Sequence, residues 1–159
     1  MDRARPISLA LACTAAIATA AIAQPARAVA GVWGGSYTCP QGVTAMRLDL
    51  REGRAGAVEG VMTFYAHPEN PGVPSGCFAM RGTFDAATGK LVLKQSRWIS
   101  RPDAGWYMID LEGRVDQNGY RSAVGFPISP GACTTFQVKQ VQRTAPPQRN
   151  VCDGPALTS

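Results

Sequence analysis

Short segments in which apolar and polar residues alternate recur between residues 31 and 143, and turn residues separate them. A period of two is typical of β-strands that have one buried and one solvated face. No window shows sustained helical periodicity, so the pattern predicts an all-β domain over residues 31–143. The strands expected from the alternation are 32–39, 43–51, 57–65, 77–84, 90–95, 106–115, 120–124 and 133–141.

The alternation also assigns the two faces of this sheet, because charged residues occupy the opposite parity to the large apolar ones. An antiparallel sheet with one apolar face curls around its own core, and about eight strands suffice to close it. We therefore predict a single up-and-down antiparallel barrel. The expected inner face comprises Trp33, Gly35, Tyr37, Met46, Leu48, Leu50, Val58, Gly60, Met62, Phe64, Phe78, Met80, Gly82, Phe84, Leu91, Leu93, Tyr107, Ile109, Leu111, Phe136 and Val138.

The connections between the expected strands are of two kinds. Short turns rich in Gly and Asp cover residues 52–56, 85–89 and 116–119, and proline-bearing segments cover 40–42, 66–76, 100–105 and 126–132. Successive connections of an up-and-down sheet lie at alternate ends, so all the proline-bearing segments are expected at one end. Binding residues concentrate on loops held by a rigid scaffold, which makes that end the predicted functional end.

Residues 1–28 have the pattern of a secretory signal peptide, expected to be disordered and to be cleaved after Ala23 or Ala28. Arg3 and Arg5 precede an Ala-rich apolar run that is short for a bilayer, which disfavours a transmembrane anchor. Lipidation at Cys13 is the other alternative. The prediction is an exported protein, periplasmic or extracellular, without a membrane span after cleavage. Residues 144–159, which contain two adjacent prolines, are predicted to form an extended tail.

Removal of the signal segment leaves four cysteines, and an even count in an exported protein predicts two disulfides. Closure would place the end of the first strand beside the start of the last, which pairs Cys39 with Cys133. Cys77 then pairs with Cys152 and ties the tail to the barrel. No two cysteines are near neighbours and His67 is the single histidine, so neither a metal site nor a cofactor is expected.

The formal charge of the chain is +5, or +4 after cleavage at Ala23, with basic residues scattered along the sequence. Such a weak and dispersed charge, without a recognition motif, argues against a nucleic-acid partner. Attraction to acidic polymers of the cell envelope is compatible with it. The sequence does not determine the oligomeric state.

The segment Gly31-Val32-Trp33 and the late Arg143 resemble the two ends of calycin barrels, the group that contains lipocalins and avidins. That resemblance implies that Arg143 covers Trp33 in a cation–π contact with a structural role. Three further runs resemble small, uncharacterised exported β-barrel domains of bacteria, a likeness that brings no known activity. These runs are Tyr37-Thr38-Cys39-Pro40-Gln41-Gly42, Asn70-Pro71-Gly72-Val73-Pro74-Ser75-Gly76 and Cys133-Thr134-Thr135-Phe136.

Two groups of side chains in the proline-bearing segments are candidates for a binding site. His67, Glu69, Asn70 and Ser75 lie in the first, where the alternative is a rigid loop with solvated polar groups. Serine catalysis is not expected, because the run before Ser75 is not a nucleophile elbow. Trp98, Arg101, Asp103, Trp106 and Tyr107 form the second group, suited to a protein or sugar surface. The alternative there is that both tryptophans cap the barrel mouth.

These features predict a non-enzymatic binding module of the cell envelope that uses its proline-bearing loops against a protein or a glycan. One alternative is an inhibitor of an exported hydrolase, either a protease or a lysozyme. The other is a calycin-like carrier of an apolar small molecule. We expect no catalytic residues, because paired carboxylates, metal-ligand spacing and a triad are all missing from the sequence.

Overall fold

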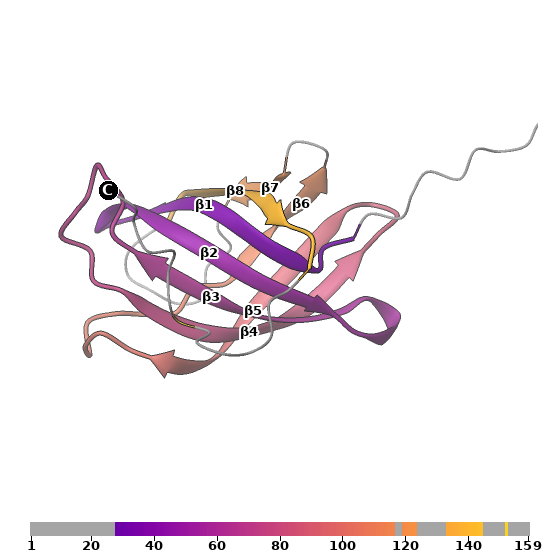
Figure 1. Cartoon of the computed structure of the whole chain (residues 1–159), viewed down its shortest axis with the longest axis horizontal. Coiled ribbons are helices and arrows are strands. Elements are labelled where there is room, and N and C mark those ends of the chain that lie inside the picture. The colour runs from indigo at the N-terminus through magenta and orange to yellow at the C-terminus, as the bar shows by residue number, and fades with distance from the viewer. Residues whose placement is uncertain (1–27, 117–118, 124–132, 145–151, 153–159) are drawn as a thin grey trace, which may run out of the picture.

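The computed structural model describes residues 28–116, 119–123, 133–144 and 152. Eight strands form a closed barrel in which each strand pairs antiparallel with the next and β8 returns to β1 (Figure 1). The predicted all-β, up-and-down antiparallel barrel is therefore confirmed. The strands are β1 (Gly31–Cys39), β2 (Gly42–Glu52), β3 (Ala57–Tyr65), β4 (Gly76–Asp85), β5 (Lys90–Ser100), β6 (Leu111–Asp116), β7 (Gly119–Ala123) and β8 (Thr135–Gln142).

Several predicted segments lie outside the described residues. They are the signal peptide up to residue 27, the tip of the 116–119 turn, the 126–132 segment, and the tail apart from residues 144 and 152. Within the part of the chain that the structure describes, the helical element is a single turn, Arg54–Gly56, and no helix is long and apolar enough to span a membrane.

The seam of the barrel joins β1 to β8. The two strands pair from Val32 opposite Gln142 to Thr38 opposite Thr135, and Cys39 forms a disulfide with Cys133 just beyond the last pair. Their Cα atoms are 3.8 Å apart. The second predicted bridge is also present, because Cys77 at the start of β4 is bonded to Cys152. Both disulfide predictions are confirmed, and both bridges lie at the end of the barrel where β1 ends and β4 begins.

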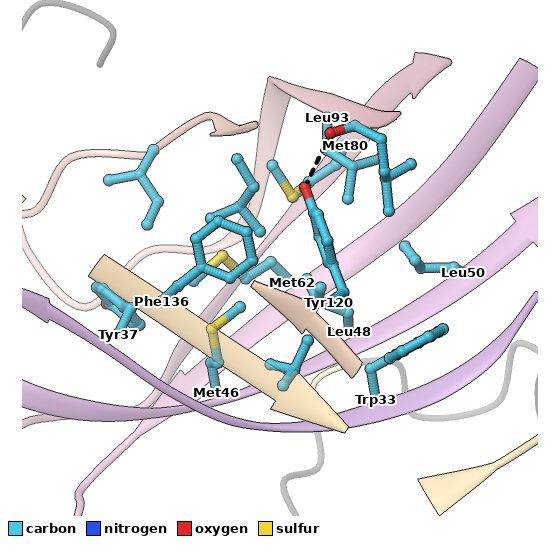
Figure 2. Packing of buried hydrophobic residues seen from close by; sticks show 14 of the residues in the cluster. Trp33, Tyr37, Met46, Leu48, Leu50, Met62, Met80, Leu93, Tyr120 and Phe136 are labelled. Atoms are coloured by element: carbon cyan, nitrogen blue, oxygen red, sulfur yellow. Dashed lines mark hydrogen bonds between the residues drawn. The ribbon is translucent and has the colours of Figure 1, made fainter. Parts of the chain in front are cut away.

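Large side chains fill the interior of the barrel (Figure 2). Every predicted inner residue with a side chain is buried except Tyr107, which is 59% exposed. Tyr120 is a central member of the core that the alternation did not single out. Its hydroxyl donates a hydrogen bond to the Leu91 carbonyl at 3.2 Å, and its ring meets that of Phe136 edge to face at 4.7 Å. The hydroxyl is thus paired inside an apolar environment.

The largest departures from the predicted strands occur around β5, which continues five residues beyond the expected end at Gln95. Met80 pairs with Gln95 and Ala79 with Arg97, so Ser96 is an extra residue, a β-bulge. An inserted residue reverses the parity that follows it. The bulge therefore turns Trp98 toward the core, where the uninterrupted alternation places Ile99.

The expected strand 106–115 begins only at Leu111, so the prediction of its first half is wrong. The ladder between β5 and β6 stops at Leu93 opposite Leu111. Beyond that pair, the Gln95 amide donates to the Asp110 carboxylate at 2.9 Å instead of to a backbone carbonyl. Lys94 binds the same carboxylate at 2.8 Å. A side chain thus replaces the next ladder bond, and residues 101–110 form a loop.

The described connections are sorted between the two ends as predicted. Residues 40–41, 66–75 and 101–110 join strands at the left end in Figure 1, whereas 53–56 and 86–89 join them at the right end. The left end is called the loop end below, and the right end is called the turn end. The proline-bearing segments within the described chain therefore share the loop end with both disulfides.

The buried hydroxyl of Tyr120 provides a test of the packing. Tyr120→Phe removes one buried hydrogen bond while the ring remains, so we expect a loss of about 1–2 kcal/mol in the free energy of unfolding, measured by urea denaturation. Tyr107→Phe is the matched control and should leave the stability unchanged, because its ring is largely in solvent. Equal stability of the Tyr120→Phe and wild-type proteins would contradict the assigned hydrogen bond.

Candidate functional site

Four aromatic rings close the barrel at the loop end. Trp106 stacks on Phe64 with ring centroids 5.1 Å apart, and Trp98 meets Phe64 edge to face at 6.2 Å and Phe78 at 5.4 Å. Phe64 and Phe78 are buried, and both tryptophans are half-buried. We call these four residues the aromatic cap. The cap is the arrangement named above as the alternative to a binding role for the tryptophans.

Arg101 uses its guanidinium group to hold the loop that follows β5. Its Nη2 donates to the carbonyls of Ala104 at 2.6 Å and Trp106 at 2.9 Å, and its Nε donates to Trp106 at 3.2 Å. The guanidinium carbon also lies 5.6 Å from the centroid of the Trp98 ring, a cation–π distance. Arg101, which was predicted to contact a partner, therefore donates these hydrogen bonds within its own loop.

Asp103 also stabilises this loop, through hydrogen bonds that it accepts. Its Oδ1 accepts a hydrogen bond from the Gly105 amide at 2.7 Å, and its carbonyl accepts one from the Trp106 amide at 3.3 Å. Short side-chain acceptors of this kind stabilise turns by mimicking backbone hydrogen bonds. Residues 101–106 are consequently fixed by hydrogen bonds at both ends and by the stacking of Trp106.

Asn70 anchors the other candidate loop, residues 66–75. Its Nδ2 donates to the carbonyls of Gln41 at 2.6 Å and Val43 at 3.1 Å, which ties this loop to the turn between β1 and β2. Its own amide donates to the His67 carbonyl at 2.8 Å. Val73 of the same loop is buried against the core. Asn70 is thus placed as a structural residue of the loop end.

The other three candidates of that loop do not converge on one point. His67 accepts a hydrogen bond from the Glu69 amide at its Nδ1, at 3.2 Å, which makes the ring part of the turn. The side chains of Glu69 and Ser75 are exposed. Within the described residues, no three His, Cys, Asp or Glu side chains are placed to hold a metal ion.

A small polar network at the turn between β1 and β2 was not found from the sequence. The buried Tyr37 forms side-chain hydrogen bonds with Thr44 and Gln41, and burial raises its pKa well above the ordinary value of 10.0. Gln41 in turn donates to the Thr44 hydroxyl at 3.2 Å. These residue types are ordinary in strands and turns, so no sequence signal marks them.

Contacts between the loops make one continuous surface, which we call the loop rim and define as residues 40–42, 66–76 and 99–107. A Cβ atom on Gly76 would lie 2.9 Å from the Pro102 ring, so the loops touch where β4 begins. Asn70 provides the second junction. The rim presents two large apolar side chains to solvent, Ile99 at 42% and Tyr107 at 59% exposure.

Trp33 lies at the turn end, away from the rim, and its Nε1 donates to the Val29 carbonyl at 2.9 Å. The Arg143 backbone lies beside Gly31, where closure was predicted to bring it, and its side chain is exposed. The cation–π contact seen in the described chain is that of Arg101 with Trp98. A contact between Arg143 and Trp33 stays a prediction.

No family model matches the chain, and searches of curated proteins and of solved structures find no match to it. The closed barrel agrees with the topology of calycins, but membership of that group and of the small exported bacterial domains stays a prediction.

Arg101 offers a test of how the rim is held. Arg101→Lys keeps the charge but loses the fork that binds two carbonyls together, so the loop should open more often. We expect hydrogen exchange of the Gly105 and Trp106 amides to accelerate about tenfold or more. Arg97→Lys, an exposed arginine of β5, is the control and should not change these rates. Unchanged exchange in Arg101→Lys would contradict the bracing role.

The buried Tyr37 predicts loss of stability in alkali. Because its folded-state pKa is raised, its contribution is fully present below pH 10 and declines above it, as the unfolded chain ionises first. Each such tyrosine lowers the unfolding free energy by up to about 1.4 kcal/mol per pH unit. Urea denaturation between pH 9 and 11 should show a shallower decline in Tyr37→Phe than in wild type. The decline in Tyr107→Phe should match the wild type; equal slopes in all three proteins would refute the assignment.

Proposed function

We propose that the protein is an exported, non-enzymatic binding module of the cell envelope whose loop rim binds a protein partner. The observation that carries the proposal is the exposure of Ile99, at the end of β5, and of Tyr107, in the loop that Arg101, Asp103 and the aromatic cap hold in place. Binding to a preorganised loop avoids much of the entropy loss of ordering it.

Export is supported by the two disulfides, since such bonds persist in oxidising compartments and are rare in the cytosol. The sequence of residues 1–28, with its basic start and apolar run, is the second support. Both bridges end at the loop rim. Their position suits a surface that must keep its shape outside the cell.

A protein partner is favoured over a glycan by the chemistry of the exposed groups. Ile99 offers only an aliphatic surface, and the donors of Arg101 are directed at carbonyls of its own loop. Sugar recognition needs convergent hydrogen-bonding groups beside an aromatic ring. Exposed apolar and aromatic side chains on a braced surface are instead typical of protein interfaces.

One observation favours hydrolase inhibition as the form that this binding takes. Residues 66–75 contain three exposed prolines, and Asn70 and the buried Val73 hold the loop at two points. A rigid, projecting loop is what an inhibitor presents to an enzyme. The carrier alternative receives no such support, because a ligand would have to displace core side chains such as Met62 and Tyr120.

The two exposed apolar residues of the rim provide the test. The partner is captured from envelope extract on immobilised protein, identified, and purified for titration. The double variant Ile99→Ser, Tyr107→Ser should weaken the measured Kd at least about tenfold, because apolar anchors dominate such interfaces. Val141→Ser is the control: it removes an even more exposed apolar side chain, 69% in solvent, from the turn end of β8.

Three outcomes separate the hypotheses. If the control weakens binding as much as the double variant, or the double variant binds normally, the rim is not the site. Retention of the protein on purified envelope polysaccharide, without a protein partner, would replace the protein by a glycan. A captured hydrolase that loses activity on titration would establish the inhibitor alternative.

A further inference from the structure

The boundary of the fold at the turn end falls between two adjacent residues. Ala28 is exposed, whereas Val29 is completely buried and belongs to the hydrophobic core. Val29 covers the turn end of the barrel next to Trp33, which Figure 2 shows on the inner side of β1. Among the residues that the structure describes, Val29 is therefore the first one that packs into the core.

Every backbone polar group of Val29 and Ala30 has a partner. The amides of both residues donate to the same Glu52 carboxylate oxygen, Ala30 at 3.0 Å. The Val29 carbonyl accepts from Trp33 Nε1, and the Ala30 carbonyl accepts from Gln140 Nε2 at 2.9 Å. Four bonds from three strands thus position this dipeptide. A carboxylate that faces the nitrogen of a buried residue is suited to hold a positively charged amine.

The sequence places a processing signal directly before this point. Ala26 and Ala28 occupy the two positions where a signal peptidase requires small residues, for cleavage after Ala28. The alternative site after Ala23 would leave residues 24–28 attached to the buried Val29. Its nitrogen would then remain an amide with one hydrogen and no charge. Cleavage after Ala28 converts it into an ammonium group beside Glu52.

We propose that the mature protein begins at Val29 and that Glu52 binds its α-ammonium group in an ion pair that locks the turn end. The inference rests on export, which is part of the proposed function. The step is hydrolysis of one peptide bond: water adds across the Ala28–Val29 amide, the carboxylate leaves with the signal peptide, and the amine of Val29 takes up the proton. Removal of residues 1–28 lowers the formal charge from +5 to +3.

The first experiment determines the mature N-terminus. The full chain is expressed in a bacterium with its own first 28 residues, and the exported protein is analysed by N-terminal sequencing and intact mass. A start at Val29 is expected. A start at Gln24 would overturn the inference while leaving export intact, whereas a chain that keeps Met1 inside the cell would overturn export as well.

Two variants exclude trimming after cleavage at the other site. Ala23→Arg blocks a cut after residue 23 and should still yield a start at Val29. Ala28→Arg blocks the proposed cut and should abolish that start. If Ala23→Arg prevents processing and Ala28→Arg does not, the cleavage occurs after residue 23 and the assignment to Ala28 is wrong.

The second experiment measures the ion pair itself. Glu52→Gln keeps a hydrogen-bond acceptor but removes the charge, so it should raise the unfolding equilibrium constant of the protein that starts at Val29 about three- to fivefold. A version refolded with residues 24–28 attached should respond less, since its Val29 nitrogen is a neutral amide. Glu59→Gln, another exposed carboxylate, is the control. Equal effects of Glu52→Gln on both lengths would overturn the ammonium site.

Discussion

Pairing between β1 and β8 closes the sheet, and the positions of the loops and of both disulfides depend on it. Closure gives each of the eight strands a neighbour on both sides, and it brings Cys39 to Cys133, residues that are 94 positions apart in the sequence. The approach of the two strands is so close at Gly35 that a Cβ atom there would overlap the Gln137 carbonyl oxygen. Only glycine fits at that point of the seam. The same closure collects the proline-bearing loops at one end.

How far the alternation predicts the fold depends on whether a strand is regular. In β1 to β4 the side chains predicted to face inward are buried. The ladders between these strands contain no inserted residue, so the alternation is not interrupted. In β5 the bulge at Ser96 lies in a run of polar residues, and nothing in the residue types marks the inserted position. Trp98 is therefore an inner residue that parity alone places outside.

The outer face is also less solvated than a period of two suggests. Val61 and Thr63 alternate with core residues of β3, and both are buried, with exposures of 8% and 1%. Thr63 lies opposite Cys77, which is bonded to Cys152. A period of two reflects the pleat of a strand, so it does not predict how far the outer face of β3 is exposed.

For the candidate site, the sequence predicted at which end of the barrel the loops gather, but it did not predict which contacts each loop residue makes. Arg101, Asp103 and Asn70 bind backbone groups of neighbouring loops, and a carbonyl acceptor leaves no mark in the residue types around it. The sequence assigns Tyr107 both to the candidate group and to the inner face of an expected strand, and the structure exposes its ring at the rim. Both ends of the barrel are closed by the chain itself, by Val29 at the turn end and by the aromatic cap at the loop end. With the interior occupied and the side chains of Arg101, Asp103 and Asn70 engaged in bracing, the proposed binding role falls to the exposed apolar groups of the rim, Ile99 and Tyr107.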